Sequence, residues 1–253
     1  PFLDDFNSVN VKNDQGLKSD DPFTPETAPL DPRLDMTVGR RGIPYLDWGA
    51  HPGNNWIRDQ ANGGPYAPKK SIYAKKQQES LSDKSFWSTG ITANNYTIIR
   101  FADVLLMAAE AEVEVGSLDK AKDLVNRVRE RAATPGGWVK TYVDPAAPEK
   151  GFTSTPAANY KIGLYSAFSD KVYGRKAVRF ERKLELAMEG SRFFDLVRYG
   201  TAAEELNAYI AAEKSRRSYM NSAAFTKGQD EYFPIPRTQI DLSKGTLKQN
   251  PGH

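Results

Sequence analysis

The chain has 253 residues, 26% of them charged and 39% hydrophobic, and its 35 Lys and Arg against 32 Asp and Glu give a formal net charge of +3. This length allows one large domain or two small ones, and so balanced a charge does not indicate a nucleic-acid-binding surface. The absence of cysteine excludes disulfides, thiolate metal sites and cysteine nucleophiles. No run of apolar residues approaches the roughly 18 of a membrane span.

Residues 1–70 are predicted to form a loop-rich region. Nine of the 16 prolines lie there, and because proline fixes φ and removes a hydrogen-bond donor, no long helix is expected. The same stretch contains Tyr45, Trp48, Trp56 and Tyr66, aromatic residues that a disordered linker usually lacks. The sequence therefore predicts an ordered, aromatic-rich surface loop, a type of segment that often carries function.

The first helical elements are predicted after this region. Apolar residues at three- to four-residue spacing indicate a helix over 98–115, which Gly116 would end in the left-handed conformation. Ser117 or Asp119 would then cap a second helix. Because the turn between the two helices is so short, they must pack antiparallel, as a helical hairpin over 96–133.

A long connection over 134–168, with several prolines and glycines, separates this hairpin from the next. Ser169 or Asp170 would cap the following helix and Gly190 would end it, and shorter helices follow, the last over 202–213. The expected division of the chain is a loop-rich ligand-side region over 1–95, a helical hairpin over 96–133, a long loop over 134–168, a second helical hairpin over 169–213 and an extended C-terminal tail over 214–253.

These elements predict a mainly α-helical fold with little β structure, built from irregular, TPR-like helical hairpins and long ordered loops. Each hairpin has roughly the 34-residue span of a tetratricopeptide unit. The long loop between the two hairpins excludes a regular tandem array of such units.

Three segments carry recognisable motifs: YTIIRFADVLLMAAEA over 96–111, ERKLELAMEGSRFFDLVRYG over 181–200 and YFPIP over 232–236. DPRL over 31–34 precedes them and QNPG over 249–252 follows. In order, spacing and terminal placement these motifs resemble the SusD/RagB family of outer-membrane nutrient-binding lipoproteins. The chain also begins without an initiator Met or a basic signal region. It is therefore expected to be the C-terminal half of a longer SusD-like protein.

The resemblance implies binding rather than catalysis, with no cofactor. Proteins of this family sit on the cell surface of the outer membrane as a lid on a SusC-like TonB-dependent transporter. They capture an oligosaccharide, or in some members a peptide, and deliver it for import. Their helical repeats mostly face the transporter, and their loop-rich side holds the ligand. The lipid anchor would lie in the absent N-terminal part.

Candidate ligand-binding residues follow from chemistry, because ligand residues differ between members of the family. Sugar rings present flat C–H faces on which indole and phenol rings stack, while amides and charged groups bind the hydroxyls. An alternative for each tryptophan is that it pins the loop to the core. The candidates are Tyr45, Trp48, Asn54, Asn55, Trp56, Arg58 and Tyr66, with Trp87 and Trp138 as further ones.

A glycosidase is a competing interpretation, because Glu185 and Glu189 are spaced one helical turn apart and paired carboxylates hydrolyse glycosidic bonds. The favoured interpretation is a structural ion-pair network that neutralises both acids. The residues assigned to this network are Arg182, Glu185, Glu189, Arg192, Asp195 and Arg198. A second competing interpretation is a helical-repeat interaction subunit that captures peptide.

No obligatory metal is predicted. His51 could bind a metal only with partners such as Asp47 and Asp59, and a role as a hydrogen-bonding loop residue is favoured. A calcium site among the acids of 4–35 stays open, although their pattern is not that of an EF-hand.

Overall fold

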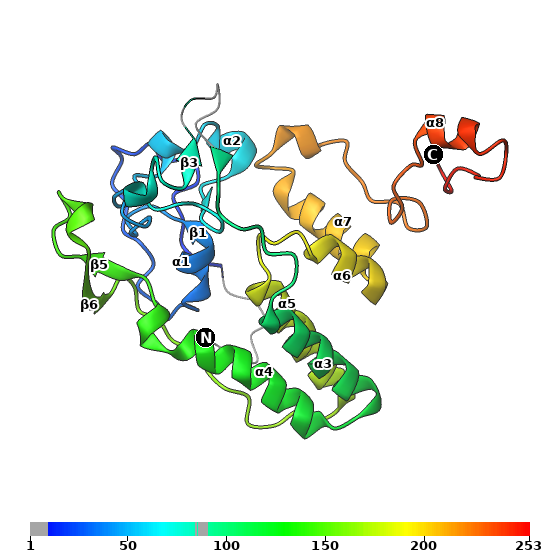
Figure 1. Cartoon of the computed structure of the whole chain (residues 1–253), viewed down its shortest axis with the longest axis horizontal. Coiled ribbons are helices and arrows are strands. Elements are labelled where there is room, and N and C mark those ends of the chain that lie inside the picture. The colour runs from blue at the N-terminus through cyan, green and yellow to red at the C-terminus, as the bar shows by residue number, and fades with distance from the viewer. Residues whose placement is uncertain (1–9, 84, 86–90) are drawn as a thin grey trace. The chain divides into compact units, whose positions relative to one another are not determined.

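The computed structural model describes residues 10–83, 85 and 91–253. The chain divides into two compact units, Pro1–Met188 and Glu189–His253, and its regular elements are mainly helices (Figure 1). This confirms the predicted fold class. In the described ranges no helix is long and apolar enough to cross a lipid bilayer.

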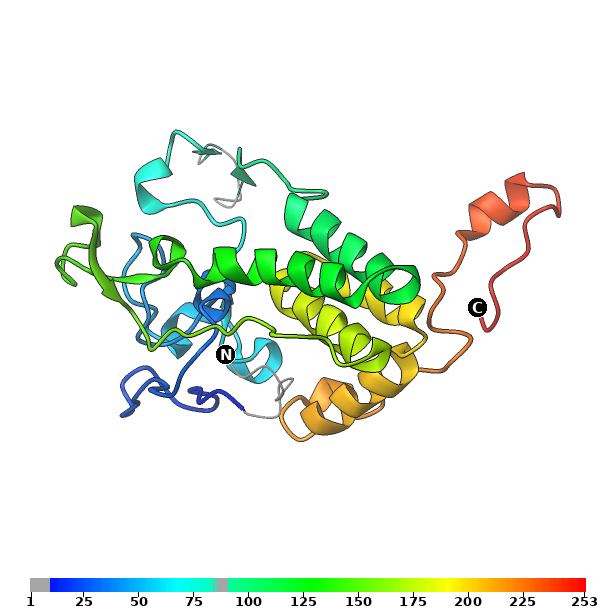
Figure 2. The same ribbon diagram turned by 90° about the horizontal axis from the view of Figure 1, so that it is seen from below.

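Three long helices form the core of the first unit: α3 (Phe101–Val115), α4 (Leu118–Ala133) and α5 (Lys171–Glu185). They pack against one another and lie side by side (Figures 1 and 2). Their shared core includes Leu106, Val113, Val125 and Val178. A Cβ at Gly174 would lie 3.3 Å from Val113 Cγ2, so this glycine lets α5 approach α3 closely.

Two of the three helix caps predicted from the sequence are present in the structure. Ser117 accepts a hydrogen bond from the amide of Lys120, and Asp170 accepts one from Tyr173. Gly116 is not left-handed, since its φ is −125°. A Cβ at Gly116 would instead lie 2.0 Å from Oε2 of Glu112, which folds over the helix end. The glycine therefore leaves room for this carboxylate, which accepts a hydrogen bond from the amide of Ser117 at 2.9 Å.

Two predicted helix boundaries are wrong. α3 begins at Phe101, and Ile98, which the sequence places on its buried face, is 85% exposed. α5 ends at Glu185, before Gly190 is reached. Met188 follows with a φ of +65°, a left-handed conformation that no helix interior contains.

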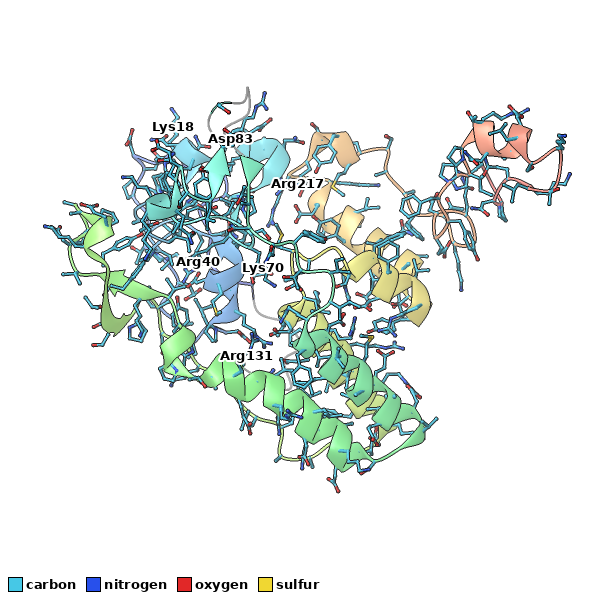
Figure 3. All side chains as sticks on the ribbon, viewed as in Figure 1. Lys18, Arg40, Lys70, Asp83, Arg131 and Arg217 are labelled. Carbon is cyan, nitrogen blue, oxygen red and sulfur yellow. The ribbon has the colours of Figure 1, made fainter. Side chains whose placement is uncertain are left out.

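The loop-rich part of the first unit carries short elements between ordered loops, and it is densely filled with side chains, among them those of Lys18, Arg40 and Lys70 (Figure 3). Within the described residues its strands form three two-stranded antiparallel ladders, which pair β1 with β2, β3 with β4 and β5 with β6. These strands are β1 (Val38–Gly39), β2 (Ala67–Pro68), β3 (Ser82–Asp83), β4 (Ile91–Thr92), β5 (Lys140–Tyr142) and β6 (Phe152–Pro156). The short helices are α1 (Arg33–Thr37), α2 (Gln60–Gly63) and single 3₁₀ turns over Asn54–Trp56, Lys75–Gln77, Pro135–Gly137 and Pro148–Lys150.

The second unit contains α6 (Arg192–Tyr199) and α7 (Ala202–Glu213), which pack together. Gly200 joins them with a φ of +70°, a left-handed cap that favours glycine. A 3₁₀ turn over Ser218–Met220 follows, and α8 (Arg237–Leu242) interrupts the tail that was expected to be extended.

The second hairpin takes a different form from the one predicted over 169–213. α5 packs on α3 and α4 within the first unit, whereas α6 packs on α7 within the second. The sequence shows that helices are consecutive, but the partner of each helix is decided by which apolar faces match in three dimensions.

Candidate ligand-binding site

The aromatic loop over 43–56 is an ordered hairpin. The amide of His51 donates to the carbonyl of Ile43 at 3.0 Å, and the amide of Tyr45 donates to the carbonyl of Gly49 at 2.9 Å. The backbone of this loop is therefore paired with itself, as an ordered rather than a disordered segment requires.

Side chains anchor this hairpin to neighbouring segments of the first unit. The carboxylate of Asp47 accepts hydrogen bonds from the amides of Lys75 and Lys76, at 2.5 and 3.0 Å. On the other side, the hydroxyl of Tyr142 in β5 donates to the carbonyl of Leu46 at 2.6 Å. The hairpin is thus held at a fixed position between the 75–77 turn and β5.

His51 is buried at the base of the hairpin, and its Nδ1 accepts a hydrogen bond from the amide of Gly53 at 3.0 Å. Burial lowers the pKa of His51 to about 4, so the ring is neutral at physiological pH and Nε2 carries its proton. Asp47 and Asp59, the acids proposed as its metal partners, accept instead from backbone amides. Among the described residues no cluster of three acidic or histidine side chains is placed to hold a metal ion.

Three rings form an aromatic cluster, Tyr45–His51–Trp56, on one side of this loop. Their centroids lie 5.8 Å apart for Tyr45 and His51, 5.7 Å for Tyr45 and Trp56 and 5.4 Å for His51 and Trp56, all in edge-to-face geometry. Gly39 makes room for them, because a Cβ there would lie 2.5 Å from the Tyr45 ring. The hydroxyl of Tyr45 donates to the carbonyl of Pro68. Two of the predicted candidates, Tyr45 and Trp56, are therefore brought together.

The tryptophans differ in whether the indole nitrogen is held by a hydrogen bond to a backbone carbonyl, which we call pinned. The indole nitrogen of Trp48 donates to the carbonyl of Tyr73 at 3.0 Å, and that of Trp138 donates to the carbonyl of Ala132 at 2.8 Å. Trp56 is 45% exposed, and within the described residues its indole nitrogen has no hydrogen-bond partner. Trp56 is thus the tryptophan of the loop that is open to a ligand, while Trp48 pins the loop. Trp87 lies outside the described residues.

The other candidates of the loop differ in burial. Asn54 and Asn55 form the 3₁₀ turn that ends at Trp56, and Arg58 follows as an exposed side chain. Tyr66 is half-buried, and burial raises the pKa of its hydroxyl, which hydrogen-bonds Asn13. Whether any of these side chains contacts a ligand stays a prediction.

A pocket of about 580 Å³ opens beside the same hairpin, within the range of about 300–1,000 Å³ typical of ligand sites. Its apolar and aromatic lining includes Trp138, Phe152, Leu46 and Met36. Its polar lining includes Lys69, Lys140 and Thr153. Of the predicted candidates, Trp138 belongs to this pocket.

Phe152 and Lys69 are lining residues that sequence reasoning did not select. Phe152 stacks on Tyr142 with a centroid distance of 5.2 Å. It lies within 134–168, where aromatic residues recur along the sequence, and that recurrence was the available signal. No sequence pattern marked Lys69 as a lining residue, because a lysine that follows a proline is typical of an ordinary surface position.

Beneath the pocket lies a buried polar cluster. The carboxylate of Asp35 accepts from Nε of Arg40 at 2.5 Å and from the hydroxyl of Tyr160 at 2.6 Å. Nζ of Lys69 donates to the carbonyls of Asp35 and Pro44, at 2.7 and 2.8 Å. Every member lies within the first unit, and the cluster fixes one wall of the pocket.

A model of the SusD family matches residues 2–253. The chain belongs to the SusD family. SusD-like protein P2 of Formosa agariphila is 29% identical to it over 229 residues, which cover 83% of this chain and 39% of that protein. A SusD homolog from Bacteroides thetaiotaomicron has a similar structure, with 26% identity and a TM-score of 0.57 over 88% of this chain and 41% of the other.

The fold is shared more widely. A SusD superfamily protein from Bacteroides vulgatus superposes with a TM-score of 0.54 at 23% identity, covering 88% of this chain and 40% of that one. The chain therefore spans about two fifths of the length of the SusD relatives that it matches.

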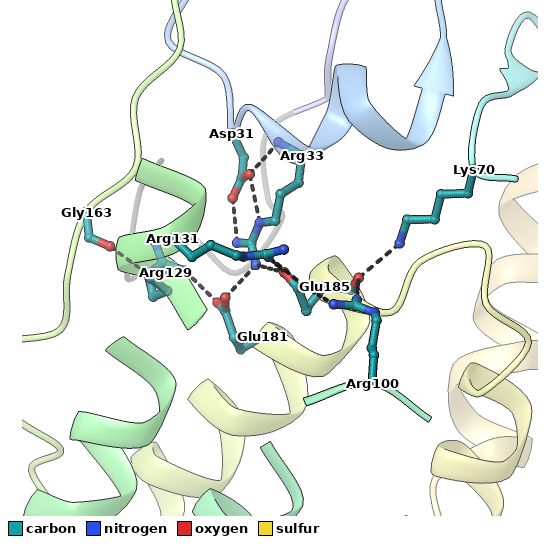
Figure 4. Close-up of polar contacts among 9 residues, drawn as sticks. All are labelled: Asp31, Arg33, Lys70, Arg100, Arg129, Arg131, Gly163, Glu181 and Glu185. Carbon is teal, nitrogen blue, oxygen red and sulfur yellow. Dashed lines mark hydrogen bonds and ion pairs between the residues drawn. The ribbon is translucent and has the colours of Figure 1, made fainter. Parts of the chain in front are cut away.

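The second SusD motif supplies a buried ion-pair cluster (Figure 4). Glu181 accepts from Nη1 of Arg33 at 2.5 Å and from Nη1 of Arg129 at 2.6 Å. One turn later, Glu185 accepts from Arg33 at 3.1 Å and from Arg131 at 2.6 Å. These bonds tie the 31–34 segment and α4 to α5, which explains why distant motifs act as one structural unit.

Cations also gather on the C-terminal end of α5. The carbonyl of Glu185 accepts from Nζ of Lys70 at 3.0 Å and from Nη2 of Arg100 at 2.6 Å. Lys70 comes from the loop after β2 and Arg131 from α4, and both reach this end (Figures 3 and 4). Positive groups are favourable there because the unpaired carbonyls of a helix end carry partial negative charge.

The pairs of the second motif lie only in part among the residues predicted for its ion-pair network. Arg198 pairs with Asp195 inside that set, whereas Arg182 pairs with Asp103 and Arg192 with Glu205. Glu185 forms ion pairs with Arg33, Arg100 and Arg131, which come from elsewhere in the chain. Because α5 ends at Glu185, Glu189 does not share a helical face with it.

Proposed function

We propose that this protein captures oligosaccharides at the surface of the outer membrane and delivers them, chemically unchanged, to a SusC-like TonB-dependent transporter. A lipid anchor would hold it at the membrane. Membership of the SusD family supports the proposal, and so does the likeness to SusD-like proteins. The observation that carries it is the pairing of an exposed, unpinned Trp56 with an aromatic-walled pocket on the same ordered loop.

The arrangement suits sugar capture for a physical reason. A sugar presents C–H faces that stack on aromatic rings, together with hydroxyls that need directional partners. Trp56 and Tyr45 supply aromatic rings for stacking on the surface, and Trp138 and Phe152 supply them in the pocket. Their supporting contacts hold the rings in place before a ligand arrives, which reduces the entropy lost on binding.

Capture without chemistry is favoured by the surroundings of two acids in the second motif of this chain. Glu181 and Glu185 are buried, and both accept hydrogen bonds from arginines. A glycosidase instead needs one carboxyl that donates a proton to the leaving oxygen and one that faces the sugar. Neither of these two acids is placed for such a role.

Trp56→Ala is expected to weaken oligosaccharide binding by about tenfold, the loss of about 1.4 kcal/mol when one stacking ring is removed. Phe152→Ala should have a similar effect through the pocket. The measurement is isothermal titration calorimetry of the 253-residue chain with plant and host oligosaccharides and a set of peptides.

Tyr96→Ala is the matched control, because Tyr96 is an aromatic side chain of the same unit that is 78% exposed and lies in neither surface. It should leave binding unchanged. Binding of peptides in place of sugars would favour the alternative of peptide capture. Sugar binding that survives both Trp56→Ala and Phe152→Ala would place the ligand elsewhere.

A further inference from the structure

The polar lining of the 580 Å³ pocket has one sign of charge. Two lysines, Lys69 and Lys140, line it, and within the described part of the chain no acidic residue does. The remaining lining is aromatic, aliphatic, glycine backbone or the hydroxyl residue Thr153. A wall of this kind lowers the local dielectric constant, so the two positive charges act on a ligand more strongly than on open surface.

Lys69 is held in place as part of this wall. Its side chain is buried, and Nζ donates to the carbonyls of Asp35 and Pro44. An ammonium group has three N–H donors, and the third has no partner among the residues that the structure describes. Lys140, on β5, likewise has no ion-pair or hydrogen-bond partner for its amine within these residues.

The nearest charges do not neutralise this lysine. The carboxylate of Asp35 is already occupied by Arg40 and by the hydroxyl of Tyr160. The ring of His51, whose pKa is lowered by burial and by the charge of Lys69, is neutral at physiological pH. Asp35 and Arg40 cancel one another, so Lys69 and Lys140 leave the pocket with a net positive charge.

We propose that this pocket recognises an acidic sugar, a glycan residue whose carboxylate or sulfate group binds Lys69 and Lys140 while its ring lies against Trp138 and Phe152. The inference rests on the proposed function and specifies its substrate class. A carboxylate or sulfate supplies the acceptors that the free lysine donors lack, and charge-assisted hydrogen bonds of this type are about twice as strong as neutral ones.

The ionisation of Lys69 agrees with this assignment. Burial lowers the pKa of Lys69 to about 8, because the buried amine has fewer acceptors than water would provide. It still carries its proton at pH 7. A bound anion would replace the missing solvation and stabilise the charged form.

The test compares matched acidic and neutral ligands by calorimetry on the whole chain. The probes are tetragalacturonate and its methyl ester, and sulfated neocarratetraose and its desulfated form. At least one acidic probe is expected to bind about tenfold more tightly than its neutral counterpart, a difference of about 1.4 kcal/mol. The galacturonate and sulfate pairs distinguish the two kinds of anionic group.

Lysine variants locate the preference. Lys140→Met, at a side chain without a structural partner in the described residues, should remove most of the difference between the acidic probe and its neutral form. Lys69→Met should do the same, and Lys140→Met keeps the test valid if loss of the Lys69 bonds impairs folding. Lys161→Met, at an exposed lysine outside the pocket, should leave the preference intact.

The outcomes separate the two proposals. Equal binding of acidic and neutral probes, or a preference that survives Lys140→Met and Lys69→Met, would overturn the acidic-sugar assignment and leave sugar capture standing. Failure of every glycan, neutral or acidic, to bind would overturn both.

Discussion

Glu181→Gln is expected to lower the free energy of unfolding by about 3–5 kcal/mol, because removal of one partner leaves buried charges uncompensated. Glu181 is 0% exposed, and each of its carboxylate oxygens accepts from a different buried arginine, Arg33 or Arg129. Burial by itself would lower the pKa of Arg33, but Glu181 and Asp31 more than offset this and raise it. Glutamine keeps the shape of the side chain and removes the charge.

Denaturant unfolding followed by tryptophan fluorescence measures this effect. All four tryptophans lie in the first unit, so the signal reports the part of the chain that holds the cluster. Glu114→Gln is the matched control, since Glu114 pairs with Arg175 at 2.6 Å on an exposed part of the helices. The control should cost about 0–1 kcal/mol. Equal losses of unfolding free energy in the two variants would show that the buried cluster stabilises the fold no more than an exposed ion pair does.

The same cluster shows what the sequence could not predict about the ion pairs. The acidic and basic residues of the second motif invite pairing with each other, because they are neighbours along the chain. In the structure Glu181 pairs with Arg33, 148 residues away, and with Arg129, 52 residues away. The charge of a residue is visible in sequence, but its partner depends on the packing of α4 and the 31–34 segment on α5.

Helix boundaries were predicted well where a capping side chain or a local apolar pattern determines where the helix begins or ends. Ser117 caps α4, and α7 runs from Ala202 to Glu213 as expected. The start of α3 was wrong because Ile98 continues the apolar spacing, yet it finds no core to pack against and is exposed. Periodicity indicates what a residue could bury, whereas the tertiary neighbours determine what it does bury.

The candidate site was predicted in part. Aromatic residues in a proline-rich loop pointed to the hairpin over 43–56. In the structure the two tryptophans of this hairpin differ, because the indole nitrogen of Trp48 donates a hydrogen bond to the carbonyl of Tyr73 whereas Trp56 is exposed. The pocket could not have been predicted, because Leu46, Lys69 and Phe152 come from three segments that share no local pattern.

Acidification from pH 7.5 to pH 5 is expected to remove about 2 kcal/mol of stability through His51 alone, given its pKa of about 4 in the folded chain and about 6.5 when unfolded. The sign follows from which state binds the proton. Above pH 6.5 the ring is neutral in both states and contributes no pH dependence. As the pH falls from about 6.5 to about 4, the unfolded chain takes up a proton that the buried ring refuses, so the folded state loses stability.

Burial causes this shift, and the positive charge of Lys69 adds to it. Denaturant unfolding at a series of pH values, again followed by tryptophan fluorescence, would measure the slope for the wild type and for His51→Asn. Asparagine has an oxygen that can accept from the amide of Gly53 as Nδ1 does, but it does not titrate. Acidic residues also gain protons near pH 5, and they do so in both proteins. The slope that the wild type has and His51→Asn lacks therefore belongs to His51.

The other histidine, His253, is exposed in the second unit, so His253→Asn should retain the wild-type slope. A wild-type slope in His51→Asn would mean that His51 is accessible to protons in the folded state. That would contradict the burial of its ring against Tyr45 and Trp56.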